Sequence, residues 1–276
     1  MKYYPLIRGR QFDLLALREA VQQDQLSPQI IPVLEPVKDL PALVSVAQAF
    51  SAAAHPLYII QNPQVGDYGL LAAPRYVPVL DEWVRPARYF DGQPAPLLIA
   101  QTKAQVQTLP KKQLALVPNE ARVRQLTHPQ AIYLEDHTPT RERTEDYATV
   151  QREFYQYPMQ ALPGVGFADY PLAVQHFDAH GYPQRAIALH LLYPQGDSLW
   201  LQHFVSVNNA DYSDPAGKFF EALAPLPAWL VAHPEASTPA TDALLAFAAQ
   251  QHFPGLGTVR KLQLRHLLRI MGRWLA

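Results

Sequence analysis

The sequence predicts one α/β domain that resembles a (β/α) barrel of the TIM type, with a β-hairpin near its eighth strand and helices at its C-terminal end. Three observations predict this fold. Short apolar runs alternate with segments of helical spacing, each run ends in a polar residue, and no glycine fingerprint of a nucleotide-binding sheet accompanies them. A length of 276 residues is ordinary for one such barrel.

The composition is that of a folded protein from a reducing compartment. Hydrophobic residues make up 49% of the chain and charged residues 17%, which provides for an extensive core. Cysteine is absent, which excludes disulfides and thiolate chemistry, and no apolar run reaches the roughly 18 residues of a membrane helix. The first residues lack the pattern of a signal peptide. We therefore expect a cytoplasmic protein without a membrane partner, and its net charge of −1 gives no general attraction to nucleic acid.

The apolar runs predict buried parallel strands, because they are continuous and not alternating. Strands are expected at residues 4–7, 30–34, 57–60, 97–100, 114–117, 132–134 and, more weakly, 165–167, with 187–192 and 199–205 closing the series. The last two runs flank a short turn that contains Gly196-Asp197, and they therefore also have the pattern of a hairpin.

Helical spacing fills the intervals between these runs. Helices are expected within 13–21, 40–47, 76–90 and 147–154, and from Lys218 onward. Near the C-terminus, Ser237-Thr238-Pro239 has the pattern of a helix start, and Thr258 is expected to cap a last helix that runs to Ala276.

Two architectures satisfy this alternation, a closed barrel and an open doubly wound sheet. The number of repeats and the missing glycine fingerprint favour the barrel. Because no long linker interrupts the chain, the sequence predicts a single domain over residues 1–276, with 218–276 as a helical extension packed on it.

Polar residues follow the predicted strands, and in a parallel barrel such positions meet at one mouth. Carboxylates beside cations there suit an anionic or phosphorylated ligand, and the same carboxylates could hold a divalent metal ion. The catalytic candidates are Glu35, Asp136, Asp169 and His190. The ligand-binding candidates at this mouth are Arg8, Arg10, Lys38, Asn62 and Gln101. The alternative is that these residues only mark the ends of strands.

Two further features have structural and functional interpretations. His190 and His203 lie in successive strands of the predicted hairpin, either facing one another or on opposite sides of the sheet, and a structural role is favoured over metal binding. The last helix carries cations every four residues from Lys261 to Arg273. A docked helix with its cations in water explains this stripe, and the alternative is a surface for nucleic acid or an acidic partner.

A series of segments, in order along nearly the whole chain, resembles one protein family. These segments are 3–12 with 17–19, 31–38, 61–63, 166–170, 188–193, 203–206, 217–219 and 255–262. They resemble the beta-protein family, a group of uncharacterised bacterial and phage proteins. The resemblance implies a barrel-like α/β fold, a phage-related or anti-phage defence setting and a nuclease-like protein partner. It also adds His203 and Lys218 to the ligand-binding candidates.

Two functions follow from these observations. The first is a binding protein that takes an anionic ligand or a protein partner at the mouth, which the lack of a recognised catalytic motif favours. The second is a metal-assisted phosphodiesterase or nuclease-like hydrolase on the same scaffold, which the convergence of three or more carboxylates would favour.

Overall fold

The computed structural model describes residues 1–136, 138, 141–156, 164–172, 177 and 185–276. Where the sequence predicts one domain, the contacts of the chain group into two compact units. Unit 1 comprises Met1–His137, Met159–Phe177 and Leu275–Ala276, and unit 2 comprises Thr138–Pro158 and Asp178–Trp274. Among the described residues, no helix has the length and apolar character needed to cross a membrane.

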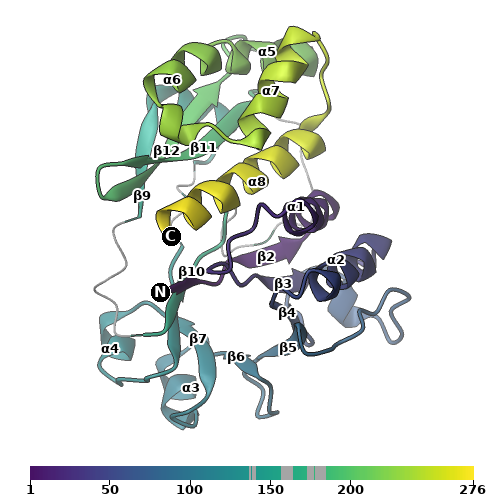
Figure 1. The fold of residues 1–276 in the computed structure, drawn as a ribbon, viewed down its shortest axis with the longest axis vertical. Coiled ribbons are helices and arrows are strands. Elements are labelled where there is room, and N and C mark those ends of the chain that lie inside the picture. Colours follow the sequence, from purple (N-terminus) through teal and green to yellow (C-terminus); the bar gives the residue numbers. More distant parts are fainter. Residues whose placement is uncertain (137, 139–140, 157–163, 173–176, 178–184) are drawn as a thin grey trace. The chain divides into compact units, whose positions relative to one another are not determined.

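Unit 1 is built on a nine-stranded sheet in which every neighbouring pair of strands is parallel, as the continuous apolar runs predict (Figure 1). Its strands are β1 (Lys2–Tyr3), β2 (Leu6–Gly9), β3 (Val33–Pro36), β4 (Leu57–Ile60), β5 (Val84–Tyr89), β6 (Leu97–Ile99), β7 (Leu114–Pro118), β8 (Ala131–Leu134) and β10 (Gly166–Ala168). Their order across the sheet is β1-β10-β8-β7-β6-β5-β4-β3-β2.

The sheet is strongly curled. β1 and β2 stand at the two ends of the strand order, although only Tyr4 and Pro5 separate them in the chain. This first segment is hydrogen bonded on both sides: the amide of Tyr4 donates to Phe167 over 2.8 Å, and the carbonyl of Tyr3 accepts from Ile31 over 2.8 Å. The sheet therefore has the curvature of a barrel, as predicted.

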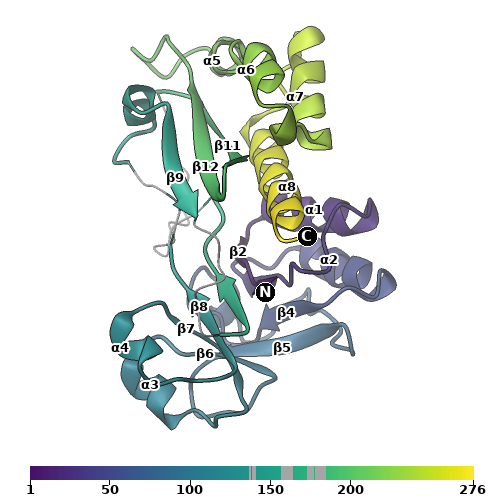
Figure 2. The ribbon, with the colours of Figure 1, turned by 60° about the vertical axis from the view of Figure 1, so that its left-hand side comes forward.

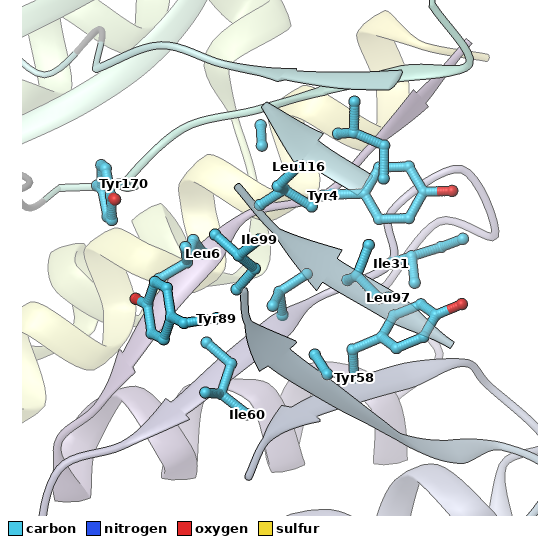
Figure 3. Close-up of a cluster of buried hydrophobic side chains, with 14 residues drawn as sticks. Tyr4, Leu6, Ile31, Tyr58, Ile60, Tyr89, Leu97, Ile99, Leu116 and Tyr170 are labelled. Carbon is cyan, nitrogen blue, oxygen red and sulfur yellow. The ribbon is translucent and has the colours of Figure 1, made fainter. Parts of the chain in front are cut away.

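The inner face of the curled sheet forms a hydrophobic core to which β2–β8 and β10 all contribute (Figure 3). Figure 3 shows aromatic rings at its two ends, with Tyr4 and Tyr58 at one end, Tyr89 and Tyr170 at the other, and aliphatic side chains between them. Side chains alternate between the two faces of a strand, so every second residue of each strand enters this core. The inward-facing residue that follows the core residues along each strand lies at the strand end.

Helices follow only some of the strands, so the fold is barrel-like without being a closed TIM barrel. The described α-helices of unit 1 are α1 (Gln11–Gln22), α2 (Pro41–Ala52), α3 (Lys103–Thr108) and α4 (Ala121–Arg124). The connections 61–83 and 90–96, which are described throughout, contain only the 3-10 turn η1 (Tyr68–Leu70).

Unit 2 is built on a three-stranded antiparallel sheet in the order β11-β12-β9 (Figure 2). Its described elements are η2 (Thr144–Thr149), β9 (Arg152–Gln156), β11 (Ala188–Gln195), β12 (Ser198–Val205), α5 (Pro215–Leu223), α6 (Leu226–Ala232), η4 (Pro234–Ala236), α7 (Pro239–Ala249) and α8 (Leu256–Trp274). The predicted hairpin is confirmed, but it belongs to this sheet and does not supply the eighth strand of the barrel. One face of the sheet packs on the helices through Leu189, Leu191 and Phe204.

Helix α8 covers the open edge of β11. The side chain of Gln263 accepts a hydrogen bond from the amide of His190 over 2.6 Å, and Nε2 of His266 donates to the carbonyl of Leu192 over 2.7 Å. Two backbone groups of an edge strand are thereby satisfied by side chains one helical turn apart. Nδ1 of His266 then accepts from the hydroxyl of Thr238, the residue that caps α7, over 3.0 Å.

Several predicted elements are wrong. The segment 76–90 contains strand β5 where a helix is predicted, and 147–154 contains the end of η2 and the start of β9. Thr258 lies within α8, which begins at Leu256, and is not its cap. The basic stripe of α8 is also less solvated than predicted: Nε of both Arg265 and Arg269 is buried, and Arg273 donates to the carbonyl of Ser237 over 2.7 Å.

Candidate functional site

The candidate site lies at the carboxyl ends of β2, β3 and β5 in unit 1, and strand alternation places its residues there. Leu6 of β2 and Val33 of β3 belong to the inner core. Two residues further along, the same side of each strand carries Arg8 and Glu35, which stand opposite one another in the register of the sheet. Two opposite charges therefore follow directly on the apolar core.

Arg8 and Glu35 form a buried ion pair through Nη1 and Oε2. Arg8 is 5% exposed and Glu35 is 0% exposed. Two neutral donors complete the contacts of the carboxylate: the hydroxyl of Tyr89 donates to Oε2 over 2.7 Å, and the amide of Gln64 donates to Oε1 over 2.8 Å. Nη1 of Arg8 also donates to the Tyr89 hydroxyl over 3.3 Å. The pair is thus held in a defined orientation.

Asn62 positions Tyr89. Its Nδ2 donates to the carbonyl of Tyr89 over 2.9 Å, and its Oδ1 accepts from the amide of Tyr89 over 2.9 Å. The side chain therefore continues the hydrogen-bond ladder of the sheet beyond the end of β4. The structure thus brings Asn62 to the same strand ends as Arg8 and Glu35, through its hydrogen bonds to Tyr89.

Two tyrosines surround the ion pair with neutral phenols. Burial raises the pKa of Tyr89 to about 12 and also raises the pKa of Tyr170. The charge of Arg8 opposes both rises, and the carboxylate of Asp136 adds to the rise of Tyr170. The guanidinium of Arg8 lies 4.9 Å from the centre of the Tyr170 ring, within cation–π range. Asp136 is exposed, and its carboxylate acts on the pKa of Tyr170.

Of the other candidates on unit 1 strand ends, Gln101 is linked to this pair through Gln64. Gln101 donates to the side chain of Gln64 over 2.9 Å and so supports the loop whose amide binds Glu35. Lys38 is exposed, and the guanidinium of Arg10 lies 4.9 Å from the centre of the Phe177 ring.

The structure does not bring Asp169 to the ion pair. Ala168 and Tyr170 belong to the inner core, so alternation turns Asp169, which lies between them, to the opposite face. There its carboxylate accepts a hydrogen bond from the hydroxyl of Tyr3, whose ring stacks on Phe167. The prediction that Asp169 shares a cleft with Arg8, Glu35 and Asn62 is wrong, because it did not take into account which face of the sheet the Asp169 side chain points to.

The remaining candidates belong to unit 2. His190 and His203 face one another across β11 and β12, with 2.7 Å between their Nδ1 atoms, and are therefore not strand-end residues of the barrel. Lys218 is buried in α5, and its Nζ donates to the carbonyl of Asp211 over 2.6 Å. This contact fastens the loop before α5, which is a structural role.

The described residues contain no group of three or more His, Asp or Glu side chains placed to hold a metal ion. Glu35 is engaged by its three donors, and Asp169 lies on the other face. The carboxylates named from the sequence therefore do not converge as a metal-assisted hydrolase requires.

Tyr89, Tyr170 and Gln64 are site residues that the sequence does not predict. Tyr89 lies in the segment expected to be helical, which concealed its place at a strand end. Tyr170 directly follows Asp169, and it is Tyr170 and not Asp169 that lies on the same face as Ala168 and the inner core. No signal in the sequence marks Gln64, because its contribution is a backbone amide.

Comparison with protein-family models, with curated proteins and with solved structures finds no match to this chain.

Proposed function

We propose that unit 1 is a binding domain that takes a small anionic ligand, such as a phosphate or a phosphorylated molecule, at the mouth of its curled sheet. Arg8 is the anion-binding group, and Glu35 and Tyr89 hold its guanidinium in place. The observation that carries this proposal is the buried Arg8–Glu35 pair at the ends of β2 and β3.

Stability alone does not explain why an ion pair is buried at this position. Removing two charges from water costs several kcal/mol per ion, and well-packed apolar residues often serve a core as well or better. At this position the inner core is otherwise apolar or phenolic. A guanidinium that is held in one orientation at a strand-end mouth suits the recognition of a planar or tetrahedral anion, because little ordering is needed when the ligand arrives.

The surroundings of the pair favour an anion over a cation. Glu35 already accepts hydrogen bonds from Tyr89 and Gln64 and pairs with Arg8, so its charge is compensated. The raised pKa values of Tyr89 and Tyr170 keep both phenols protonated, so both are neutral at the mouth. Arg10 and Lys38 follow the same two strands and contribute two positive charges, against the one negative charge of Asp136 near Tyr170.

The metal-assisted phosphodiesterase remains the second function suggested by the sequence, and no observation in the described residues favours it. The phage-related setting and the nuclease-like partner are proposals that rest on the resemblance to the beta-protein family.

The experiment is isothermal titration of inorganic phosphate and pyrophosphate into the wild type and two variants. The double variant Arg8→Gln/Glu35→Gln removes both charges and keeps hydrogen-bonding groups of similar size. A charge-assisted hydrogen bond contributes about 1.5–3 kcal/mol, so we expect at least about tenfold weaker binding in the double variant. Arg85→Gln is the matched control, since Arg85 is an exposed arginine at the start of β5, away from Tyr89 at its end.

Circular dichroism first establishes that both variants are folded. Equal affinity of the double variant and the wild type, or no binding of either anion by the wild type, contradicts the proposal.

A further inference from the structure

Strand β12 of unit 2 has an open edge near its end, because the strand beside it stops short. β9 pairs with β12 from Leu199 to Gln202, and on the same side the amide of His203 donates to the carbonyl of Gln151 over 2.8 Å. Within the described parts of the chain, no strand continues beside β12 beyond that point. The other edge of β12 is paired with β11 as far as Val205.

Val205 presents its backbone N–H and C=O at this open edge. In an antiparallel sheet, successive residues of a strand direct their backbone groups alternately to the two neighbouring strands. The amide of His203 faces β9, and the amide of Ser206 donates to the carbonyl of Ile187, next to β11, over 2.9 Å. The backbone groups of Val205 therefore face the side of β9, and neither has a hydrogen-bond partner among the described residues.

The end of the strand is held in place before any partner arrives. The side chain of Asn209 donates to the carbonyl of Ser206 over 2.7 Å. Oε2 of Glu221 accepts from the amides of Val207 and Asn208, each over 2.8 Å. A preformed edge lowers the cost of ordering when a further strand is added.

A cavity of about 560 Å³ lies along this edge, and residues from both faces of the sheet line it. His203 and Val205 lie on one face, where Tyr147 packs on His203 with 4.9 Å between ring centres. Phe204 lies on the other face, where Trp229 contacts it edge to face with 5.3 Å between ring centres. An added strand needs room on both faces, because its side chains point alternately to one and the other.

This edge lacks the features by which proteins keep strands from pairing with another chain. Residues 203–207 contain no Lys, Arg, Asp, Glu or Pro, and Val207 is 84% exposed. The described residues that line the cavity include no Asp, Glu, Lys or Arg either. A charged side chain would lose hydration here without gaining a partner charge, so the surroundings favour uncharged side chains.

We infer that the end of β12 binds an extended peptide segment with uncharged side chains, which adds a strand to the sheet of unit 2 where β9 leaves the edge open. One residue of the peptide exchanges two main-chain hydrogen bonds with Val205. Its side chain lies on the face of Tyr147, and the side chains of its two neighbours lie on the face of Trp229.

The unpaired groups decide the class of ligand. They are one backbone donor and one backbone acceptor of the same edge residue, and a single residue of an extended chain matches both. The site belongs to unit 2, and the inference does not depend on the anion site proposed for unit 1.

The test is calorimetric titration of the full chain with a panel of N-acetylated, C-amidated pentapeptides Ser-X-Val-X-Ser, in which X is Val, Leu, Phe or Tyr. We expect at least one of them to bind in a 1:1 ratio, and the peptide with Lys as X not to bind. N-methylation of the central valine should weaken binding about tenfold or more, because it removes one main-chain hydrogen bond and adds bulk at the edge.

Val205→Pro removes the donor of the edge and should also weaken binding about tenfold or more. Val205→Ala keeps both backbone groups and is the matched control. Proline is tolerated at an edge position whose N–H has no partner, and the N-methylated peptide decides the test if Val205→Pro does not fold.

Four results overturn the inference. No peptide of the panel binds the wild type at about millimolar concentration, the N-methylated peptide binds as tightly as its parent, or folded Val205→Pro binds as tightly as Val205→Ala. The fourth is a dimer of the wild type in sedimentation velocity that Val205→Pro dissociates, which would assign the edge to a second copy of the chain.

Discussion

Glu35 shows at the scale of one residue how a site is held together. Its side chain has no exposed surface, and Arg8, Tyr89 and Gln64 all contact its carboxylate. Removing one member of a buried ion pair leaves the other charge buried without compensation. The free energy lost on removing one partner therefore exceeds the net free energy that the intact pair contributes to folding.

Glu35→Gln should therefore lower the free energy of unfolding by about 3–5 kcal/mol. The double variant Arg8→Gln/Glu35→Gln should recover most of that loss, because neither charge is left alone. Glu82→Gln, at an exposed position of unit 1, should change stability by about 0.5 kcal/mol or less. Denaturant unfolding measures all three, and a single variant as stable as the wild type would show that Glu35 is not held as described.

Gly66 is a second residue on which the mouth depends, because it lies in the loop whose Gln64 amide binds Glu35. Its φ is +73°, and a Cβ at this position would come within 2.2 Å of the carbonyl oxygen of Val37. Gly92 has a similar φ of +84° but nothing within 4 Å of the same point. The two glycines therefore separate backbone strain from close packing.

Gly66→Ala should destabilise the protein by clearly more than Gly92→Ala, for which strain alone predicts about 1 kcal/mol. Thermal and denaturant unfolding of the two variants gives the comparison. Equal losses in both would mean that the loop moves away from Val37 at no cost.

At the scale of elements, α8 is held to β11 by polar side chains at its edge and by an apolar side toward the core of unit 2. Val259 and Leu262 belong to that core together with Leu189 and Phe219. Leu256, in the first turn of the same helix, is 50% exposed. The helix thus offers a buried and an exposed leucine for the same substitution.

Leu262→Ala should cost about 2–5 kcal/mol of stability, because it removes buried methyl groups and leaves a cavity. Leu256→Ala should be nearly neutral, since alanine is the better helix former and little buried area is lost. Denaturant midpoints with unchanged slopes would report these differences directly. A neutral Leu262→Ala would place α8 outside the cooperative core of unit 2.

At the scale of the whole molecule, the buried His266 and the mostly buried His190 make stability depend on pH. Burial is the main cause that lowers the pKa of His266 to about 4 and that of His190 to about 3, and His203 and Arg260 lower the latter further. The unfolded chain therefore binds more protons than the folded chain below the ordinary histidine pKa near 6.5. Their contribution is complete above that pKa and is lost progressively as the pH falls toward the folded values.

We expect the free energy of unfolding to fall between about pH 6.5 and pH 4.5, and to fall less steeply in His190→Asn. His252→Asn serves as the control, because His252 is exposed. Denaturant unfolding at several pH values measures the slopes. The same slope in wild type and His190→Asn would contradict the assignment of His190 as a buried neutral residue.

Much of the fold could be predicted from the sequence where burial on both faces leaves a continuous apolar run, as at residues 57–60, which form β4. Strand β5 could not, because Arg85, Pro86 and Arg88 interrupt its pattern, although it pairs with β4 and β6. The division into two units could not be predicted from the sequence either, because unit 2 takes its residues from two separate segments of the chain.

The candidate site, like the fold, could be predicted from the sequence only in part. Arg8, Glu35 and Asn62 end apolar runs and do lie together, joined by Tyr89. Asp169 also follows such a run, but the strand-end rule does not give the face of the sheet, and a shift of one residue reverses it. His190 was misplaced because an antiparallel strand has the same apolar pattern as a buried parallel one.

A crystal structure determined with tungstate, a heavy analogue of phosphate, shows whether Arg8 binds an anion at the mouth of unit 1. Anomalous scattering from tungsten gives the position of the ion directly from the diffraction data. We expect a peak within hydrogen-bond reach of the Arg8 guanidinium, with Glu35 still bound to Arg8, and no such peak in crystals of Arg8→Gln/Glu35→Gln. A peak that lies elsewhere on unit 1 and persists in the double variant, with Arg8 unoccupied, would contradict it.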